Sequence, residues 1–294
     1  MKNRSLIFIL MTLSSVVSCL SHVETAQNPI VFNPVIGHEV RSSEMSIPFP
    51  EDKTFGVWAV DNNTGRTFIH DHEISCTSGL WTSEYLPLWP DSELKFHAYS
   101  PYNLSVAFSN GAIVLDSFNI GKDGEEFMYA QTSSPQGANE GKVKLQFSHA
   151  LSRIDMRIKS GFGEDFDVRI DKVILKRVAE TGNFNSLRYP QWTTDESSIK
   201  DIIIFDSERD GNFLAGPNMQ DIGDLHTIIP QKSGSSIQVC YSFRIDDGDW
   251  IDGQSESTSE IVVHWESGRY YTYSLTLNEV KLSYTTGIGQ WTDK

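Results

Sequence analysis

The sequence predicts an all-β protein made of two tandem β-sandwich domains, and three observations support this. Nearly every regular stretch is short, rich in β-branched or aromatic residues, and bounded by Gly, Asp, Asn, Ser or Pro. No long stretch repeats its apolar residues at the spacing of a helix. The chain has 294 residues, 39% of them hydrophobic, which is enough for two cores of ordinary size.

The expected strands follow one another along the whole chain. They are residues 29–36, 55–60, 94–102, 112–118, 142–160, 167–178, 199–207, 226–231, 236–245, 260–265 and 270–277. The stretch "SSPQGANEGK" between them is rich in Ser, Gly and Pro, which is typical of a linker. We therefore expect an amino-terminal domain over residues 19–138 and a carboxyl-terminal domain over residues 139–294.

The first residues form a targeting signal. Lys2 and Arg4 precede an apolar run over residues 6–13, which is too short to span a membrane as a helix. Small residues then lead to Cys19, and this stretch, "VVSC", resembles the lipobox of bacterial lipoproteins, in which the Cys carries the lipid. We interpret residues 1–18 as a lipoprotein signal peptide and Cys19 as the lipidation site. The alternative is a soluble secreted protein in which this Cys is incidental.

Charge and motifs exclude several classes of function. The formal net charge is −15, which argues against a nucleic-acid partner because phosphate contacts need clustered Lys and Arg. The sequence has no nucleophile elbow, zinc-protease motif or phosphate loop. We therefore expect neither an enzyme nor a bound cofactor.

The most metal-like stretch is "FIHDHEISC". On a regular strand His70 and His72 point to the same face, with Cys76 nearby, but a second ligand cluster is missing. The acidic stretch over residues 246–253 lacks the spacing of a calcium loop. We interpret both as solvated surface, expect no metal site, and expect Cys76 and Cys240 to be free thiols.

The Trp residues allow two interpretations. Trp81 and Trp89 flank a turn that contains Pro, and we expect them to seal the edge of a core. Together with Trp192 they could instead form an exposed platform for a glycan.

The end of the chain reads as two strands. The first places one apolar face inward through Tyr271, Tyr273, Leu275 and Leu277, with Asn278 and Glu279 as its turn. The second segment, residues 280–294, has no obvious place in its own domain. Its apolar residues are Val280, Leu282, Tyr284, Ile288 and Trp291.

Several of these stretches, in their order and spacing, resemble the fimbrillin family of the Bacteroidetes. They are "GLWTSEYLPLWPDSELKFHAYSPY", "VKLQFSHALSRIDMRI" with Phe147, His149, Ala150, Leu151 and Ser152 at the characteristic places, "VILKRVAETGNFN", "IIPQ" at residues 228–231, and "HWESGRYYTYSLTLNEVKL" with Trp291 behind it. One departure is His97, which precedes Ala98 where a second aromatic residue is usual.

The resemblance implies two transthyretin-like β-sandwich domains and a fimbrial subunit that is structural or adhesive. Such subunits travel as lipoproteins to the outer membrane and the cell surface. A protease specific for Arg or Lys removes the amino-terminal strand, and the groove that remains accepts a strand from another fimbrial subunit, thought to come from its carboxyl terminus. This is β-augmentation used for polymerisation.

The residues can be interpreted in terms of this mechanism. In the strand that would be displaced, Ile30, Phe32 and either Val35 or Ile36 would face the core. Exposing three or four such side chains costs about 5–12 kcal/mol. The polar segment that follows offers a cleavage site between Arg41 and Ser42, and the alternative is that this Arg is an ordinary exposed loop residue.

Two questions stay open from the sequence. Residues 280–294 either donate a strand, with Val280, Leu282, Tyr284, Ile288 and Trp291 as anchors, or complete their own sheet. The protein is either such a subunit or a non-polymerising surface lipoprotein that binds a glycan or a host protein through exposed aromatic residues.

Overall fold

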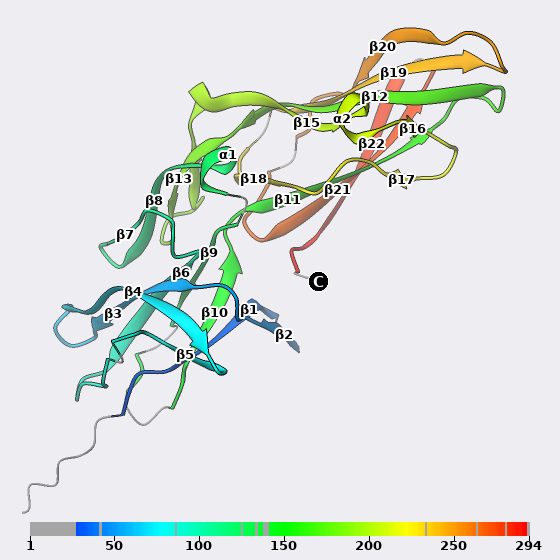
Figure 1. Cartoon of the computed structure of the whole chain (residues 1–294). Helices are drawn as coiled ribbons and strands as arrows, with labels where there is room; N and C mark the ends of the chain where they lie inside the picture. Colours follow the sequence, from blue (N-terminus) through cyan, green and yellow to red (C-terminus); the bar gives the residue numbers. More distant parts are fainter. Residues whose placement is uncertain are drawn as a thin grey trace, which may run out of the picture.

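The structure is a computed structural model that describes residues 28–40, 43–85, 87–124, 126–132, 135–137, 141–232, 234–262, 264–279 and 281–292. Side chains are described throughout these ranges except at residues 38–40 and 43–45. The molecule is elongated and consists of two sandwich-like β bodies placed end to end (Figure 1). The prediction of an all-β protein with two sandwiches is confirmed. Within the described residues, no helix has the length and apolar character needed to cross a membrane.

The first body is a sheet whose strand order closes on itself. The order is β10-β9-β6-β3-β4-β5-β1-β2, and β1 pairs in addition with β10. The bounds are β1 (Phe32–Val40), β2 (Ser43–Pro48), β3 (Phe55–Asp61), β4 (Thr67–Thr77), β5 (Leu80–Thr82), β6 (Leu94–Ser100), β9 (Met128–Gln131) and β10 (Val143–His149). Because side chains alternate along a strand, one face of each strand points into the ring. The buried aromatic residues there include Phe32, Phe55, Phe96 and Phe147.

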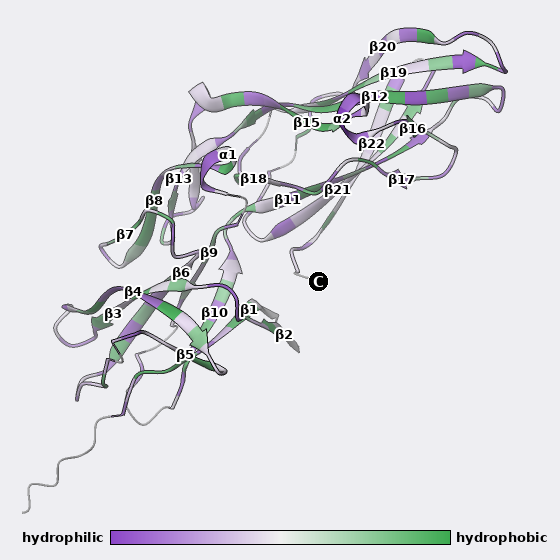
Figure 2. Ribbon diagram, viewed as in Figure 1, coloured by the Kyte–Doolittle hydropathy of each residue, from purple (hydrophilic) through white to green (hydrophobic). Residues whose placement is uncertain are grey.

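The second body packs two sheets around one core. One sheet has the order β17-β11-β21-β22 with β18 also on β11, and the other has the order β15-β12-β19-β20 with β16 also on β12. The bounds are β11 (Ser152–Ser160), β12 (Phe166–Ala179), β15 (Ile199–Asp206), β16 (Phe213–Leu214), β17 (Gln220–Asp221), β18 (His226–Ile228), β19 (Ser236–Ile245), β20 (Ile251–Ser257), β21 (Arg269–Asn278) and β22 (Lys281–Gln290). Strand colours in Figure 2 alternate between polar and apolar, as expected where one face is buried.

A third sheet joins the two bodies. Its order is β14-β13-β8-β7, with β7 (Val106–Ser109), β8 (Ala112–Asn119), β13 (Thr181–Asn185) and β14 (Trp192–Thr194). Three short helical turns, α1 (Ile120–Asp123), η1 (Glu196–Ser198) and α2 (Ser207–Asp210), lie between strands. Strands from either side of the boundary that we predicted at 138/139 pair with each other, namely β8 with β13 and β1 with β10. The third sheet and the sheet of the first body are thus each built from strands on both sides of that boundary.

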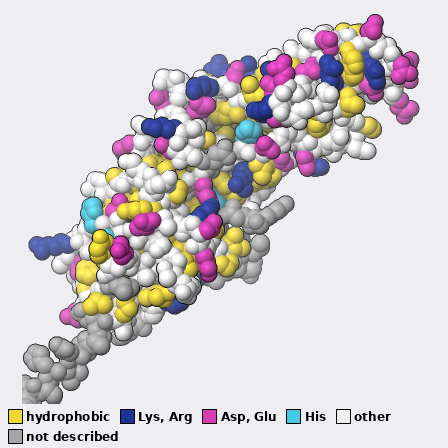
Figure 3. All heavy atoms as spheres, in the orientation of Figure 1, with side chains coloured by type: hydrophobic (Ala, Val, Ile, Leu, Met, Phe, Trp, Pro, Cys, Tyr) yellow, Lys and Arg dark blue, Asp and Glu magenta, His cyan; other side chains and the backbone are white. Residues whose placement is uncertain are grey.

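The surface carries both signs of charge. On the face shown in Figure 3, acidic and basic side chains are interspersed along both bodies, with hydrophobic side chains between them.

One local prediction about β4 was wrong. A register shift against β3 and a left-handed residue, Asp71 (φ 51), mark a β-bulge. Ile69 and Ile74, five residues apart, are both buried, so the bulge has changed the phase of the strand. His70 and His72 therefore lie on different faces instead of the same one.

Candidate functional site: the slot of the amino-terminal strand

Strand β1 lies between strands that come later in the chain. On one side it runs parallel to β10, in register from Phe32↔Val143 to Ile36↔Phe147. On the other side Phe32 pairs with Trp81 of β5, and residues 35–40 pair with β2. We call the space between β10 on one side and β5 and β2 on the other the β1 slot.

Backbone hydrogen bonds extend the slot towards the amino terminus. The Val143 N–H donates to the Val31 carbonyl at 2.8 Å, and the Ile30 N–H donates to the Pro87 carbonyl at 2.8 Å. The Trp89 N–H donates to the Asn28 carbonyl at 3.0 Å. The chain is thus held on one side from residue 28 and on the other side from residue 31.

The side chains of β1 and of the residues just before it fill the interior of the ring. Ile30, Phe32 and Ile36 are 0%, 1% and 4% exposed. The Phe32 ring packs edge-on against Phe55 and Phe96, with ring centroids 6.1 and 5.7 Å apart. Of the two alternatives for the third core position, Ile36 is the buried residue, while Val35 is only half-buried.

The candidate processing site falls between two paired strands. Val40 at the end of β1 pairs with Ser43 at the start of β2. Arg41 and Ser42 are the two residues between them and lie outside the described residues, as does Cys19.

The carboxyl-terminal segment is the outer strand of its own sheet. β22 pairs antiparallel with β21 along its whole length, from Asn278↔Lys281 to Arg269↔Gln290. Leu282 is buried and Ile288 is 61% exposed. Tyr284 is half-buried, and its ring centroid lies 6.1 Å from that of Tyr273. Val280 lies outside the described residues.

Trp291 packs where the two bodies meet. Its ring lies parallel to that of His149, the last residue of β10, at a centroid distance of 4.0 Å. The Arg153 guanidinium of β11 covers the ring at 4.3 Å, and the Trp291 N–H donates to the Gly268 carbonyl at 2.9 Å. Trp291 is 4% exposed.

The other aromatic and metal-like candidates do not form a site. Trp81, Trp89 and Trp192 are all buried, so the interpretation of Trp81 and Trp89 as core residues is confirmed and a glycan platform made of these three is excluded. Cys76 and Cys240 are free and half-buried. Among the described residues, no group of three or more His, Cys, Asp or Glu side chains is placed to hold a metal ion.

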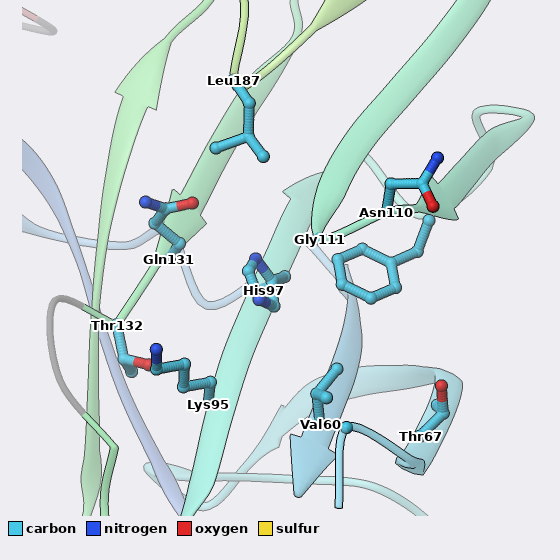
Figure 4. Close-up of a pocket in the computed structure, with 11 residues that line it drawn as sticks. Val60, Thr67, Lys95, His97, Asn110, Gly111, Gln131, Thr132 and Leu187 are labelled. Carbon is cyan, nitrogen blue, oxygen red and sulfur yellow. The ribbon is translucent and has the colours of Figure 1, made fainter. Parts of the chain in front are cut away.

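The sequence analysis missed a pocket on the outside of the first body. It has a volume of about 600 Å³ and is lined by residues of β3, β6 and β9, by the β7–β8 turn and by Leu187 (Figure 4). His97, which we noted only as a departure from the family pattern, lies in its floor. The Asn-Gly pair at residues 110–111 is a sequence pattern that predicts a hairpin, and this hairpin forms one wall of the pocket.

The fold and the inserted strand define a class of all-β proteins in which later strands form a slot for the first one. Solved structures of Bacteroides proteins share this fold. A fimbrial protein from Bacteroides vulgatus is 16% identical, with a TM-score of 0.62 over 89% of this chain and 99% of that one. Proteins assigned to cell adhesion from Bacteroides uniformis (15% identical, TM-score 0.59, 90% and 99% covered) and Bacteroides ovatus (19%, 0.58, 92% and 99%) are also similar.

A family model described as fimbrillin-like matches residues 43–291, and the chain belongs to this family. The resemblance found in the sequence is thereby confirmed. It is a family of fimbrial and cell-adhesion proteins of the cell surface, which are structural and not enzymatic. No curated protein sequence matches the chain.

Proposed function

We propose that the protein is a fimbrial subunit that is exported as a lipoprotein through Cys19, reaches the outer membrane and polymerises by strand exchange. Cleavage between Arg41 and Ser42 releases β1, and a strand of another fimbrial subunit then occupies the β1 slot. The observation that carries this proposal is the placement of β1, which is hydrogen-bonded between strands that remain after cleavage.

Burial in the slot gives the exchange its driving force. Removing Ile30, Phe32 and Ile36 uncovers apolar surface that costs about 5–9 kcal/mol at about 1.5–3 kcal/mol per side chain. This is a large part of the stability of a typical domain, so a vacant slot favours a replacement strand. The family model matches from residue 43, one residue after the amino terminus that cleavage would create at Ser42.

The donor in this proposal is the segment over residues 280–294, with Val280, Leu282, Tyr284, Ile288 and Trp291 as its anchors. Donation requires β22 to leave β21 and Trp291 to leave His149. The alternative is that the segment serves only its own sheet. Truncation after Asn278 separates the two: a folded monomer that no longer polymerises supports donation, and an unfolded monomer supports the alternative.

Protease treatment of the mature protein tests the proposal. We expect a trypsin-like protease to generate a chain that starts at Ser42 and forms ladders on gels that resist SDS but dissociate on heating. The matched control is Arg41→Gln, which should stay uncut at this position and monomeric. Protein that is cut at Arg41 and yet remains monomeric at every concentration would refute the polymerisation mechanism.

The competing function is a non-polymerising surface lipoprotein that binds through exposed aromatic residues. The three Trp residues first considered are buried, but Tyr85 and Tyr189 are 79% and 95% exposed. Loss of glycan or host-protein binding in Tyr85→Ala or Tyr189→Ala, with retained fold and no polymer after proteolysis, would favour this function.

A further inference from the structure

The pocket on the first body has a floor made of one face of the sheet. Lys95 and His97 are two residues apart on β6 and so point to the same face. Val60 of β3 pairs with Lys95, and Gln131 of β9 pairs with His97, which completes a block of four adjacent side chains. Phe96, between the two β6 residues, points into the ring, so this block faces outward.

The opposite wall is a rigid hairpin. β7 and β8 are joined by the two residues Asn110 (φ 51) and Gly111 (φ 78), whose positive φ values are those of a type I′ turn. Phe108 stacks on the buried Trp58 with ring centroids 5.8 Å apart and planes 19° apart. The Phe108 ring also lies 4.7 Å from that of His97, so floor and wall are in contact at one end of the pocket.

The polar groups of the pocket favour an anionic ligand. Among the described residues that line it there is no Asp or Glu, although the chain as a whole has a net charge of −15. Lys95 is the one cationic side chain among the described lining residues, and it forms no ion pair with any described carboxylate. A cation without a partner of its own is available to a carboxylate from outside.

His97 adds a neutral polar group. Its Nδ1 atom is buried and has no hydrogen-bond partner among the described residues. Burial, with a smaller contribution from Lys95, lowers the pKa of the His97 imidazole to about 4, so the ring is uncharged at neutral pH. A neutral imidazole offers one donor and one acceptor, which matches a hydroxyl group.

We propose that this pocket binds a saccharide that carries a carboxylate group. Lys95 pairs with the carboxylate, His97 and the amides of Asn110 and Gln131 bind hydroxyl groups, and the Phe108 ring packs against the C–H face of the sugar. A volume of about 600 Å³ lies within the range of about 300–1,000 Å³ of small-molecule sites. This assignment shares no residue with the β1 slot and does not depend on strand exchange.

The floor of the pocket offers no strand edge to an extended peptide. Peptides that add to sheets use a free strand edge, but β6 is hydrogen-bonded on both sides, to β3 and to β9. Recognition at the floor therefore comes from side chains, of which the pocket offers amides, an imidazole and a cation.

Calorimetric titration of the full mature chain tests the inference. The acidic probes are 3′-sialyllactose and digalacturonic acid, and their matched neutral probes are the methyl esters of the same two saccharides. We expect at least one acidic probe to bind at least about tenfold more tightly than its neutral counterpart, as the loss of one charged hydrogen bond predicts.

Variants locate the binding at the pocket. Lys95→Gln should weaken the acidic probe at least about tenfold, and Asn110→Gly, which removes the amide but suits the left-handed turn, should weaken both members of the pair. Lys122→Gln removes an exposed cation of α1 outside the pocket and should bind like the wild type. All three side chains are exposed, so the fold, checked by circular dichroism, should be unchanged.

Three results would overturn the inference. The first is that neither acidic probe binds. The second is that Lys95→Gln binds the acidic probe as tightly as the wild type. The third is that a short peptide with a free carboxyl terminus binds at the pocket more tightly than both acidic saccharides.

Discussion

Replacing Trp291 tests whether the end of the chain belongs to its own fold. The ring is almost fully buried, stacked on His149 and covered by Arg153. A Trp side chain buries about 150–250 Å², which corresponds to about 4–6 kcal/mol at about 25 cal/mol per Å² as an upper value. Substitutions of this kind cost about 3–5 kcal/mol, so we expect Trp291→Ala to lower the free energy of unfolding by that amount.

Urea unfolding followed by circular dichroism measures the decrease in the free energy of unfolding. The matched control is Ile288→Ala in the preceding strand, where the side chain is 61% exposed and the expected change is within about 0.5 kcal/mol. If Trp291→Ala were no more destabilising than Ile288→Ala, the Trp ring would not be buried in solution. Donation of the segment would then not require the loss of this ring contact.

Three further predictions follow from local features. Gly223 (φ 72) and Gly65 (φ 70) both need a left-handed backbone, but only at Gly223 would an added Cβ clash with the Ile204 carbonyl oxygen. Gly65→Ala should therefore cost about 1–2 kcal/mol in thermal unfolding and Gly223→Ala clearly more, whereas equal losses would contradict the packing. Because burial lowers the pKa of His97 from 6.5 to about 4, the unfolded chain binds more protons in this range and stability falls as the pH drops through it. His97→Gln should flatten this part of the profile of stability against pH. An unchanged slope would show that His97 is not the group responsible. Burial raises the pKa of the Cys240 thiol, so iodoacetamide should alkylate it more slowly in folded than in urea-unfolded protein at about pH 8, and equal rates would count against this.

The sequence alone predicted the buried face of a strand where that face depends on the alternation of apolar and polar residues. Tyr271, Tyr273, Leu275 and Leu277 are buried at 1% or less, as their spacing predicted. A strand with one buried face must repeat apolar residues with a period of two, so this pattern is visible without knowledge of any partner. The prediction that His70 and His72 share a face was wrong for a local reason. A single extra residue in a β-bulge reverses the alternation of side chains along the strand.

Pairing between distant strands could not be predicted in the same way. The parallel register of β1 on β10 joins residues more than a hundred positions apart, and nothing in the alternation of either strand specifies the other. The same is true of the pocket, because Val60, Lys95 and Gln131 come from three separate strands. Only the turn at Asn110 and Gly111 has a recognisable local signature.

The register of β1 on β10 also determines how this position would respond to tension. Bonds in a parallel pair are evenly spaced across the strands, so a strand pulled along its own axis loads those between Phe32 and Ile36 together and not one at a time. Shear of this kind must break the whole set at once, whereas peeling from one end breaks it in sequence. A filament joined through this position would resist a pull along its length by the combined strength of these bonds.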